Sequence, residues 1–213
     1  MNNPWLSIPF AEYETHMSHP DVLQSQFLGN VFADVIHTNE PRTIAILGCA
    51  TGNGLEHVEA GEVDRIVAVD VNPEYIDIAR DRHAARLPEL ELVEADILDC
   101  DFASGSFGLI HCALLLEYVD PLALIPQMAR WLTEDGDLVV VLQLASPEAF
   151  PVSETGCESL KLLEPVMRLH EPDGIAEIAR SAGLIESVGS EHQLASGKRF
   201  YIGHFRHSRD LRR

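Results

Sequence analysis

Apolar residues in this chain fall into short runs separated by polar, helix-like stretches. Runs rich in Val, Ile and Leu with little polar alternation are typical of strands buried on both faces of a sheet. Strands that alternate with helices predict a parallel sheet with helices on both faces. The predicted strands are 43–47, 65–70, 90–96, 108–113 and 137–144, and the clearest predicted helices between and after them are 72–87, 121–132 and 173–182.

The end of the chain breaks this alternation. Two strand-like runs, 184–189 and 200–205, are joined by only about ten mostly polar residues, whereas a parallel crossover needs about a dozen or more. We therefore expect an antiparallel hairpin at the edge of the sheet. The predicted fold class is α/β, a Rossmann-like, doubly wound, mostly parallel sheet of seven strands.

The segment before the first strand has its own pattern. Residues 20–37 carry apolar side chains on adjoining stripes, which predicts an amphipathic helix; residues 5–18 fit either a short helix or a flap. Prolines interrupt any simple helix between the fifth strand and the helix at 173–182. We expect one domain with an amino-terminal helical lid (1–40), a ligand-binding core (42–145), a substrate-side insert (146–172) and a final helix with the hairpin (173–213).

A glycine-rich turn follows the first predicted strand, where Gly48, Gly52 and Gly54 lie within seven residues. Such a turn lets a ligand approach the backbone, and a helix that begins after it offers free N–H groups; a tight turn alone is the alternative. Asp70 closes the second strand and Asp96 the third. Because parallel strands end at one edge of the sheet, these features predict a nucleotide-type site there.

The residues around these glycines restrict which nucleotide could bind. A dinucleotide fingerprint that starts at Gly52 would place His57 at its third glycine, which opposes close helix packing. A phosphate-binding P-loop needs a lysine, and the first lysine of the chain is Lys161. The loop itself contains no basic residue, so we expect a ligand with little or no phosphate.

The end of the first strand and its turn read Ile46-Leu47-Gly48-Cys49-Ala50-Thr51-Gly52. This run resembles the first motif of class I S-adenosylmethionine-dependent methyltransferases, which is typically D/E-x-G-x-G-x-G. Within that class, the resemblance is to the type 11/12-like small-molecule methyltransferases. The resemblance covers about residues 42–145, with 107–119 similar to the family's fourth-strand motif and 132–137 to its turn before strand five. It implies S-adenosyl-L-methionine as cofactor and S-adenosyl-L-homocysteine as product. The backbone at 48–52 would hold the methionine part, Asp70 the ribose hydroxyls, and Asp96 with Ile97 the adenine. The predicted cofactor-binding residues are Gly48, Cys49, Ala50, Gly52, Asn53, Asp70, Val71, Asp96, Ile97 and Ala113.

The motif departs from the family at two positions, where Ile46 replaces the leading acid and Ala50 the middle glycine. In the family that acid helps to hold the ammonium of the cofactor. Either binding is weaker here, or an acid from the amino-terminal segment, Glu12 or Glu14, substitutes for it.

Candidate residues for chemistry follow the fourth strand and the lid. His111 is either a general base, since its ordinary pKa is near neutral, or a hydrogen-bonded core histidine. Glu117 and Tyr118 either contact the substrate or only take part in helix packing. The lid residues Tyr13, His16 and Met17, with Tyr118, are the predicted substrate contacts. His16 and His19 lack a second pair of ligands, so we expect no metal.

Charge and composition restrict the partners. The 213 residues include 34 acidic and 15 basic ones, for a net charge of -19. This excess argues against nucleic acid, whose binding depends on lysine and arginine at phosphates. The first basic residue is Arg42, so we expect no ordinary secretory signal, which would begin with a positively charged segment. The apolar runs are shorter than the roughly 20 residues of a membrane span. We expect a cytoplasmic protein with free thiols, outside membranes, and leave its oligomeric state and the basic stretch at 198–213 unassigned.

The predicted function is methyl transfer from S-adenosylmethionine to a small molecule, an activity of the EC 2.1.1 class. In-line geometry, proximity and orientation would supply most of the rate. The alternative is a non-catalytic module that has kept the cofactor pocket and lost turnover.

Overall fold

The computed structural model describes residues 3–208. A sheet of seven strands runs through its centre in the order β3-β2-β1-β4-β5-β7-β6. The first five strands in this order are parallel, whereas β7 is antiparallel to both of its neighbours. The strands are β1 (Thr43–Leu47), β2 (Arg65–Asp70), β3 (Leu90–Glu94), β4 (Phe107–Ala113), β5 (Leu132–Leu144), β6 (Leu184–Gln193) and β7 (Arg199–His207).

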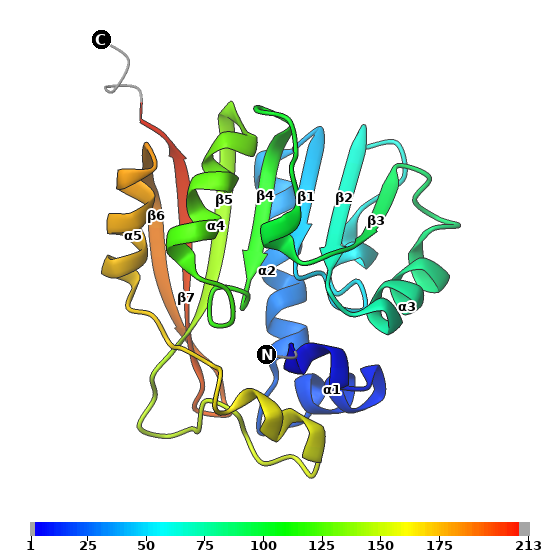
Figure 1. The fold of residues 1–213 in the computed structure, drawn as a ribbon, viewed down its shortest axis with the longest axis vertical. Coiled ribbons are helices and arrows are strands. Elements are labelled where there is room, and N and C mark those ends of the chain that lie inside the picture. The colour runs from blue at the N-terminus through cyan, green and yellow to red at the C-terminus, as the bar shows by residue number, and fades with distance from the viewer. Residues whose placement is uncertain (1–2, 209–213) are drawn as a thin grey trace.

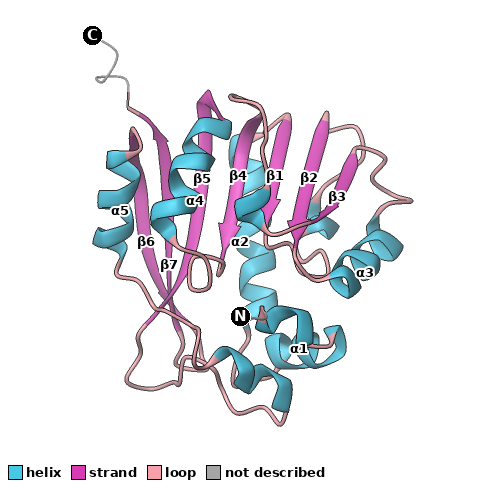
Figure 2. Cartoon of the chain, viewed as in Figure 1, coloured by secondary structure: helices cyan, strands magenta, loops and turns pink. Residues whose placement is uncertain are grey.

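Helices cover both faces of this sheet (Figures 1 and 2). In Figure 1, α4 and α5 lie in front of the sheet and α2 behind it, while α1 lies beyond the lower, carboxyl ends of the parallel strands. The α-helices are α1 (Phe10–Ser18), α2 (Gln24–Asn39), α3 (Pro73–His83), α4 (Pro121–Trp131) and α5 (Pro172–Ser181), and the 3₁₀ turns are η1 (Pro4–Ser7), η2 (Leu55–His57), η3 (Ile97–Asp99) and η4 (Glu158–Leu163).

The predicted fold class is confirmed, including the hairpin of β6 and β7. β7 inserts between β5 and β6, so β6 forms the edge. The expected turn at 132–137 is instead part of a longer β5, which begins at Leu132 and shifts register against β4 before Asp137. Strand three ends at Glu94, and Asp96 caps the 3₁₀ turn η3 that follows.

Local capping explains where helices begin. The side chain of Asn72 accepts a hydrogen bond from the backbone N–H of Glu74 at 2.9 Å, and Pro73 occupies the first position of α3. Both features favour a helix start. Helix α2 begins only at Gln24, because Leu23 has a left-handed backbone (φ 57°). The uncertain segment 5–18 forms most of η1 and all of α1.

The expected helix directly after the glycine loop is absent from the described chain, and this prediction is wrong. Only the three-residue turn η2 lies between β1 and β2. Gly52, Gly54 and Gly61 all have positive φ, at 92°, 95° and 82°, and these left-handed positions interrupt a right-handed helix. The loop therefore offers its backbone without the N-terminus of an α-helix.

Three apolar clusters hold the fold together. One joins α4 and α5 to the sheet around the fully buried Trp131, and a second packs α2 and α3 on the opposite face. The third cluster lies off the sheet and joins Ile8 to Leu160 and Leu163. We call η1, α1 and residues 150–167 together the cap. In the described part of the chain, no helix combines the length and apolarity needed to cross a membrane.

Candidate functional site

The loop after β1 is a tight backbone cradle. The N–H groups of Gly48 and Cys49 both donate to the carbonyl of Val69 on β2, at 2.9 and 3.0 Å. Gly48 has φ +70° and Gly52 +92°; a Cβ added at Gly52 would lie 2.8 Å from His83. The glycine at 52 is thus required by both conformation and space. Ala50 has φ 47° despite its side chain.

Asp70 ties this loop to the end of β2. One carboxylate oxygen accepts from the N–H of Ala50 at 2.8 Å and the other from the N–H of Asn72 at 2.9 Å. Burial raises the pKa of Asp70, and the backbone hydrogen bonds partly offset that rise. Hydrogen bonds to the charged form of an acid favour ionisation. The carboxylate therefore fixes the loop as well as facing the adjoining space.

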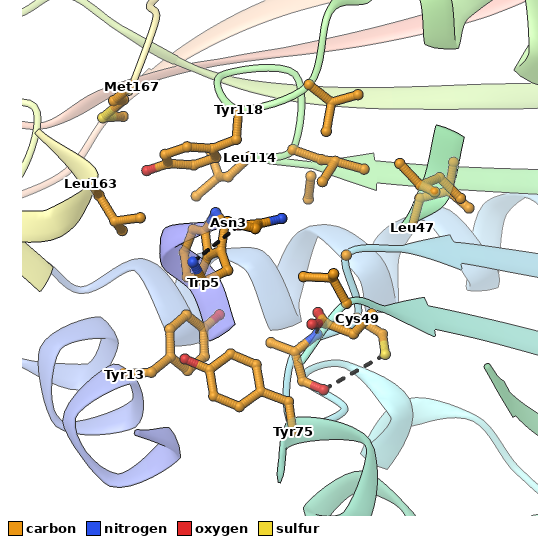
Figure 3. Close-up of a pocket in the computed structure, with 18 of the residues that line it drawn as sticks. Asn3, Trp5, Tyr13, Leu47, Cys49, Tyr75, Leu114, Tyr118, Leu163 and Met167 are labelled. Atoms are coloured by element: carbon orange, nitrogen blue, oxygen red, sulfur yellow. Dashed lines mark hydrogen bonds between the residues drawn. The ribbon is translucent and has the colours of Figure 1, made fainter. Parts of the chain in front are cut away.

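A cavity of about 450 Å³ lies between this edge of the sheet and the cap (Figure 3). Its volume is within the range typical of small-molecule sites. We call its sheet side the cofactor half and its cap side the cap half. The predicted cofactor residues that line it are Gly48, Cys49, Ala50, Asn53, Asp70, Val71, Asp96, Ile97 and Ala113; Gly52 shapes the loop without lining the cavity.

All the predicted substrate contacts, Tyr13, His16, Met17 and Tyr118, line the same cavity. Burial raises the pKa of both tyrosines well above the ordinary value. His16 shares a hydrogen bond of 2.8 Å with the hydroxyl of Thr155 in the insert, and burial lowers its pKa to about 4. The lid and the insert thus approach one another around the cavity.

The catalytic candidates separate in the structure. His111 lines the cavity from β4, where its ring meets that of Phe32 edge-on at 5.0 Å between centroids. It is buried, and its Nε2 has no hydrogen-bond partner among the described residues, so the expected hydrogen bond at that atom is missing. Burial lowers the pKa of His111 to about 4, which keeps the ring neutral and makes it a weak base near pH 7.

Glu117 lies outside the cavity lining. Its carboxylate accepts from the backbone N–H of Gln143 at 2.7 Å, beyond the end of β4. Burial raises its pKa to about 7. This contact joins Glu117 to β5, while its other carboxylate oxygen, Oε2, is buried and has no hydrogen-bond partner among the described residues.

The two acids considered as substitutes for the acid missing at Ile46 hold the cap instead. Glu14 accepts from the hydroxyl of Thr51 at 2.6 Å and pairs with Arg82, and these contacts lower its pKa. Glu12 accepts from the backbone N–H and the hydroxyl of Ser159, at 2.9 and 2.7 Å. Neither carboxylate lines the cavity. Glu14 joins α1 to the glycine loop, and Glu12 joins α1 to η4.

Sequence reasoning named Tyr13 and Tyr118 but missed Trp5 and Tyr75, which complete an aromatic wall of the cap half. Trp5, Tyr13, Tyr75 and Tyr118 all line the cavity. Trp5 contacts Tyr118 and Tyr13 edge-on, with centroids 5.0 and 6.2 Å apart, and Tyr13 contacts Tyr75 at 5.2 Å. Figure 3 shows Trp5, Tyr13 and Tyr75 following one another along this wall. The side-chain amide of Asn72 holds η1 against this wall, because it donates to the carbonyls of Trp5 and Ile8 at 2.8 and 3.3 Å. From the sequence, the Asn-Pro pair predicts only that Asn72 caps a helix.

Candidate metal ligands do not gather into a group of three within residues 3–208. Within that range no group of three or more His, Cys, Asp or Glu side chains could hold an ion. The four cysteines, Cys49, Cys100, Cys112 and Cys157, are free. Part of the basic stretch, residues 209–213, lies outside the described residues.

Comparisons with known proteins agree with this geometry. Residues 44–136 match the model of a family described as a methyltransferase domain. A ribosomal protein L11 methyltransferase from Pelobacter propionicus is 32% identical over 125 residues, which cover 57% of this chain and 39% of that protein. A demethylmenaquinone methyltransferase from Deinococcus radiodurans is 28% identical over 163 residues, 65% of this chain and 66% of that protein. This chain thus spans less than two thirds of either relative's length.

Solved structures share the fold. The N-methyltransferase NodS from Bradyrhizobium japonicum, in complex with S-adenosyl-L-homocysteine, superposes with a TM-score of 0.69 at 17% identity, covering 97% of this chain and 99% of that one. A geranyl diphosphate C-methyltransferase from Streptomyces coelicolor gives a TM-score of 0.64 at 12% identity, covering 84% and 77%.

The strand order and the cavity at the carboxyl ends of the parallel strands define a Rossmann-like α/β domain. The fold is that of class I S-adenosylmethionine-dependent methyltransferases, and residues 44–136 are similar to the methyltransferase-domain family. The predicted cofactor, S-adenosyl-L-methionine, is the one that this family uses.

Proposed function

We propose that this protein transfers the methyl group of S-adenosylmethionine to a small-molecule acceptor held in the cap half of the cavity. The observation that carries the proposal is the meeting of two walls in one cavity. The glycine cradle with Asp70 forms one wall, and the aromatic and aliphatic side chains of the cap form the other. A cofactor and an acceptor bound on the two walls would lie against each other.

The charge of the cofactor half suits S-adenosylmethionine. The backbone at Gly48 and Ala50 would hold the methionine part, Asp70 the ribose hydroxyls, and Asp96 with Ile97 the adenine. The cavity lining contains no lysine or arginine within the described residues. Such a lining suits a sulfonium and an ammonium better than the phosphates of a dinucleotide.

Transfer requires an in-line approach to the methyl carbon. When bound, S-adenosylmethionine supplies an electrophilic methyl group on a positively charged sulfur. The acceptor would take this methyl group in line as the carbon–sulfur bond breaks, with the electron pair left on sulfur. Any proton that the acceptor carries then leaves for water. The chain contributes orientation and exclusion of water, which supply most of the rate in such a reaction.

Calorimetric titration with S-adenosylhomocysteine tests the binding step, and a tritiated-methyl screen against pools of small molecules tests turnover. We expect binding together with label transferred to a low-molecular-weight product. Absence of heat at millimolar ligand would sink the proposal. Binding with no labelled product across broad pools would instead identify a non-catalytic cofactor-binding module.

A further inference from the structure

The charge of the cap half bears on the substrate class, and the argument rests on the proposed function. Among the described residues that line the cavity, the only basic side chains are His16 and His111. Burial lowers the pKa of each to about 4. The nearby buried Lys198 donates to the carbonyls of Phe150 and Pro151, at 3.1 and 2.8 Å, and does not line the cavity. The described walls thus hold no fixed cation to pair with a carboxylate or phosphate.

The carboxylates of the lining are engaged in local structure. Asp70 accepts from two backbone N–H groups, as described above. Asp96 accepts from the N–H of Leu98, and Asp120 from the N–H of Leu122, each at 3.0 Å. These acids cap the starts of η3 and α4. Asp96 and Asp120 each use one carboxylate oxygen in such a cap.

The walls of the cap half are apolar and carry flat rings. Next to these rings, the insert contributes aliphatic side chains and a thioether, and Leu160 and Leu163 pack against Trp5, Tyr13 and Tyr118. One polar group stands out: the hydroxyl of Tyr75, in a side chain only 1% exposed, has no partner among the described residues. The insert residues that line the cavity are Pro151, Val152, Leu160, Leu163, Val166 and Met167.

We propose that the cap half binds an uncharged, apolar acceptor that carries an aromatic ring. Rings of the ligand would contact Trp5, Tyr13 and Tyr118 edge-on or offset, as aromatic side chains contact one another. An anionic group would be buried without a partner, which is costly. A cationic group would find ring faces, and the lining carboxylates Asp96 and Asp120 already cap η3 and α4.

A naphthalene series tests the charge while keeping the ring constant. The probes are 2-naphthol, 2-naphthoate, 2-naphthyl phosphate and 2-(aminomethyl)naphthalene, titrated with and without saturating S-adenosylhomocysteine. We expect 2-naphthol to bind at least about 10-fold more tightly than either anion, because an anionic group would be buried without a partner. A tenfold ratio corresponds to only a modest free-energy difference. Tighter binding of an anion or of the amine, or no binding of 2-naphthol, would overturn the inference.

A charge introduced into the wall gives a second test. Met167 lines the cavity and is only half-buried, so Met167→Lys should fold. We expect this variant to bind 2-naphthoate about 10-fold more tightly than the wild type does. The matched control is Leu162→Lys, on the exposed side of η4 and 46% exposed, which should not change the ranking. Equal effects of the two variants would contradict the proposed location.

The two proposals fail separately. If S-adenosylhomocysteine does not bind but 2-naphthol does, the proposed function is wrong and the apolar ring site stands. If S-adenosylhomocysteine binds and an anionic naphthalene is preferred, the proposed function stands and the acceptor class is wrong.

Discussion

The cofactor half of the cavity is made of backbone and short polar side chains, whereas the cap half is made of large apolar ones. The first is held by hydrogen bonds such as that between Asp70 and the N–H of Ala50 at 2.8 Å. The second is held by ring contacts and by the small cluster of Ile8, Leu160 and Leu163. Hydrogen bonds fix atoms precisely, while apolar contact is non-directional. The difference suggests that one half positions a constant ligand and the other selects a variable one.

The largest expected effect lies in the cofactor half. Asp70→Ala removes the carboxylate proposed to bind the ribose and also the anchor of the loop. We expect the affinity for S-adenosylhomocysteine to fall by about 1.5 to 3 kcal/mol, as for the loss of a hydrogen bond to a charged group. Calorimetry measures it, and Asp99→Ala, an exposed acid outside the cavity lining, is the control. An unchanged affinity would mean that the ribose is held elsewhere.

Histidines from each half give the next effect, on stability. Burial depresses the pKa of His111 from 6.5 to about 4, so between these values the unfolded chain binds the proton and the folded chain does not. Stability from this residue is therefore present above pH 6.5 and is lost as the pH falls toward 4. Between pH 7 and pH 5 we expect a loss of about 2 kcal/mol.

Urea unfolding at both pH values tests this, with His111→Leu compared with the wild type. The variant should lose about 2 kcal/mol less stability between pH 7 and pH 5 than the wild type. His16→Leu, in the cap, should flatten the dependence by a similar amount, because burial lowers the pKa of His16 to about the same value. An identical pH dependence in wild type and His111→Leu would refute the linkage.

A third prediction separates the halves directly. Trp5→Ala removes the edge-on contacts with Tyr118 and Tyr13, each worth about 0.5 to 1.5 kcal/mol. We expect 2-naphthol to bind about 10-fold more weakly, while the affinity for S-adenosylhomocysteine changes by less than about threefold. Trp5→Phe, which keeps a ring, should retain most of the binding. Equal losses for both ligands would show that the two halves are one coupled site.

The same contrast explains how far the sequence could predict the molecule. Strands and the glycine loop follow from local pattern, and their strand order matches the expected class. The cap depends on contacts between distant residues, such as Glu12 with Ser159 and Asn72 with Trp5, for which no local periodicity exists. The helix expected after the loop failed for a local reason, because Gly52 and Gly54 adopt left-handed conformations that the spacing of glycines alone does not reveal.

The smallest expected effect concerns Ala50, where the family motif has glycine. Its φ of 47° lies in the left-handed region, which costs a residue with a Cβ about 1 to 2 kcal/mol. Ala50→Gly relieves that cost but adds about 0.4 to 1 kcal/mol of unfolded-chain entropy. We expect a net gain in the free energy of unfolding of about 0.5 to 1 kcal/mol, measured by urea titration. Ala68→Gly, within the extended strand β2, is the control and should destabilise. If Ala50→Gly also destabilises, the buried methyl group of Ala50 contributes packing that outweighs its backbone strain, and the departure from the motif would then be a stabilising feature of the cofactor half.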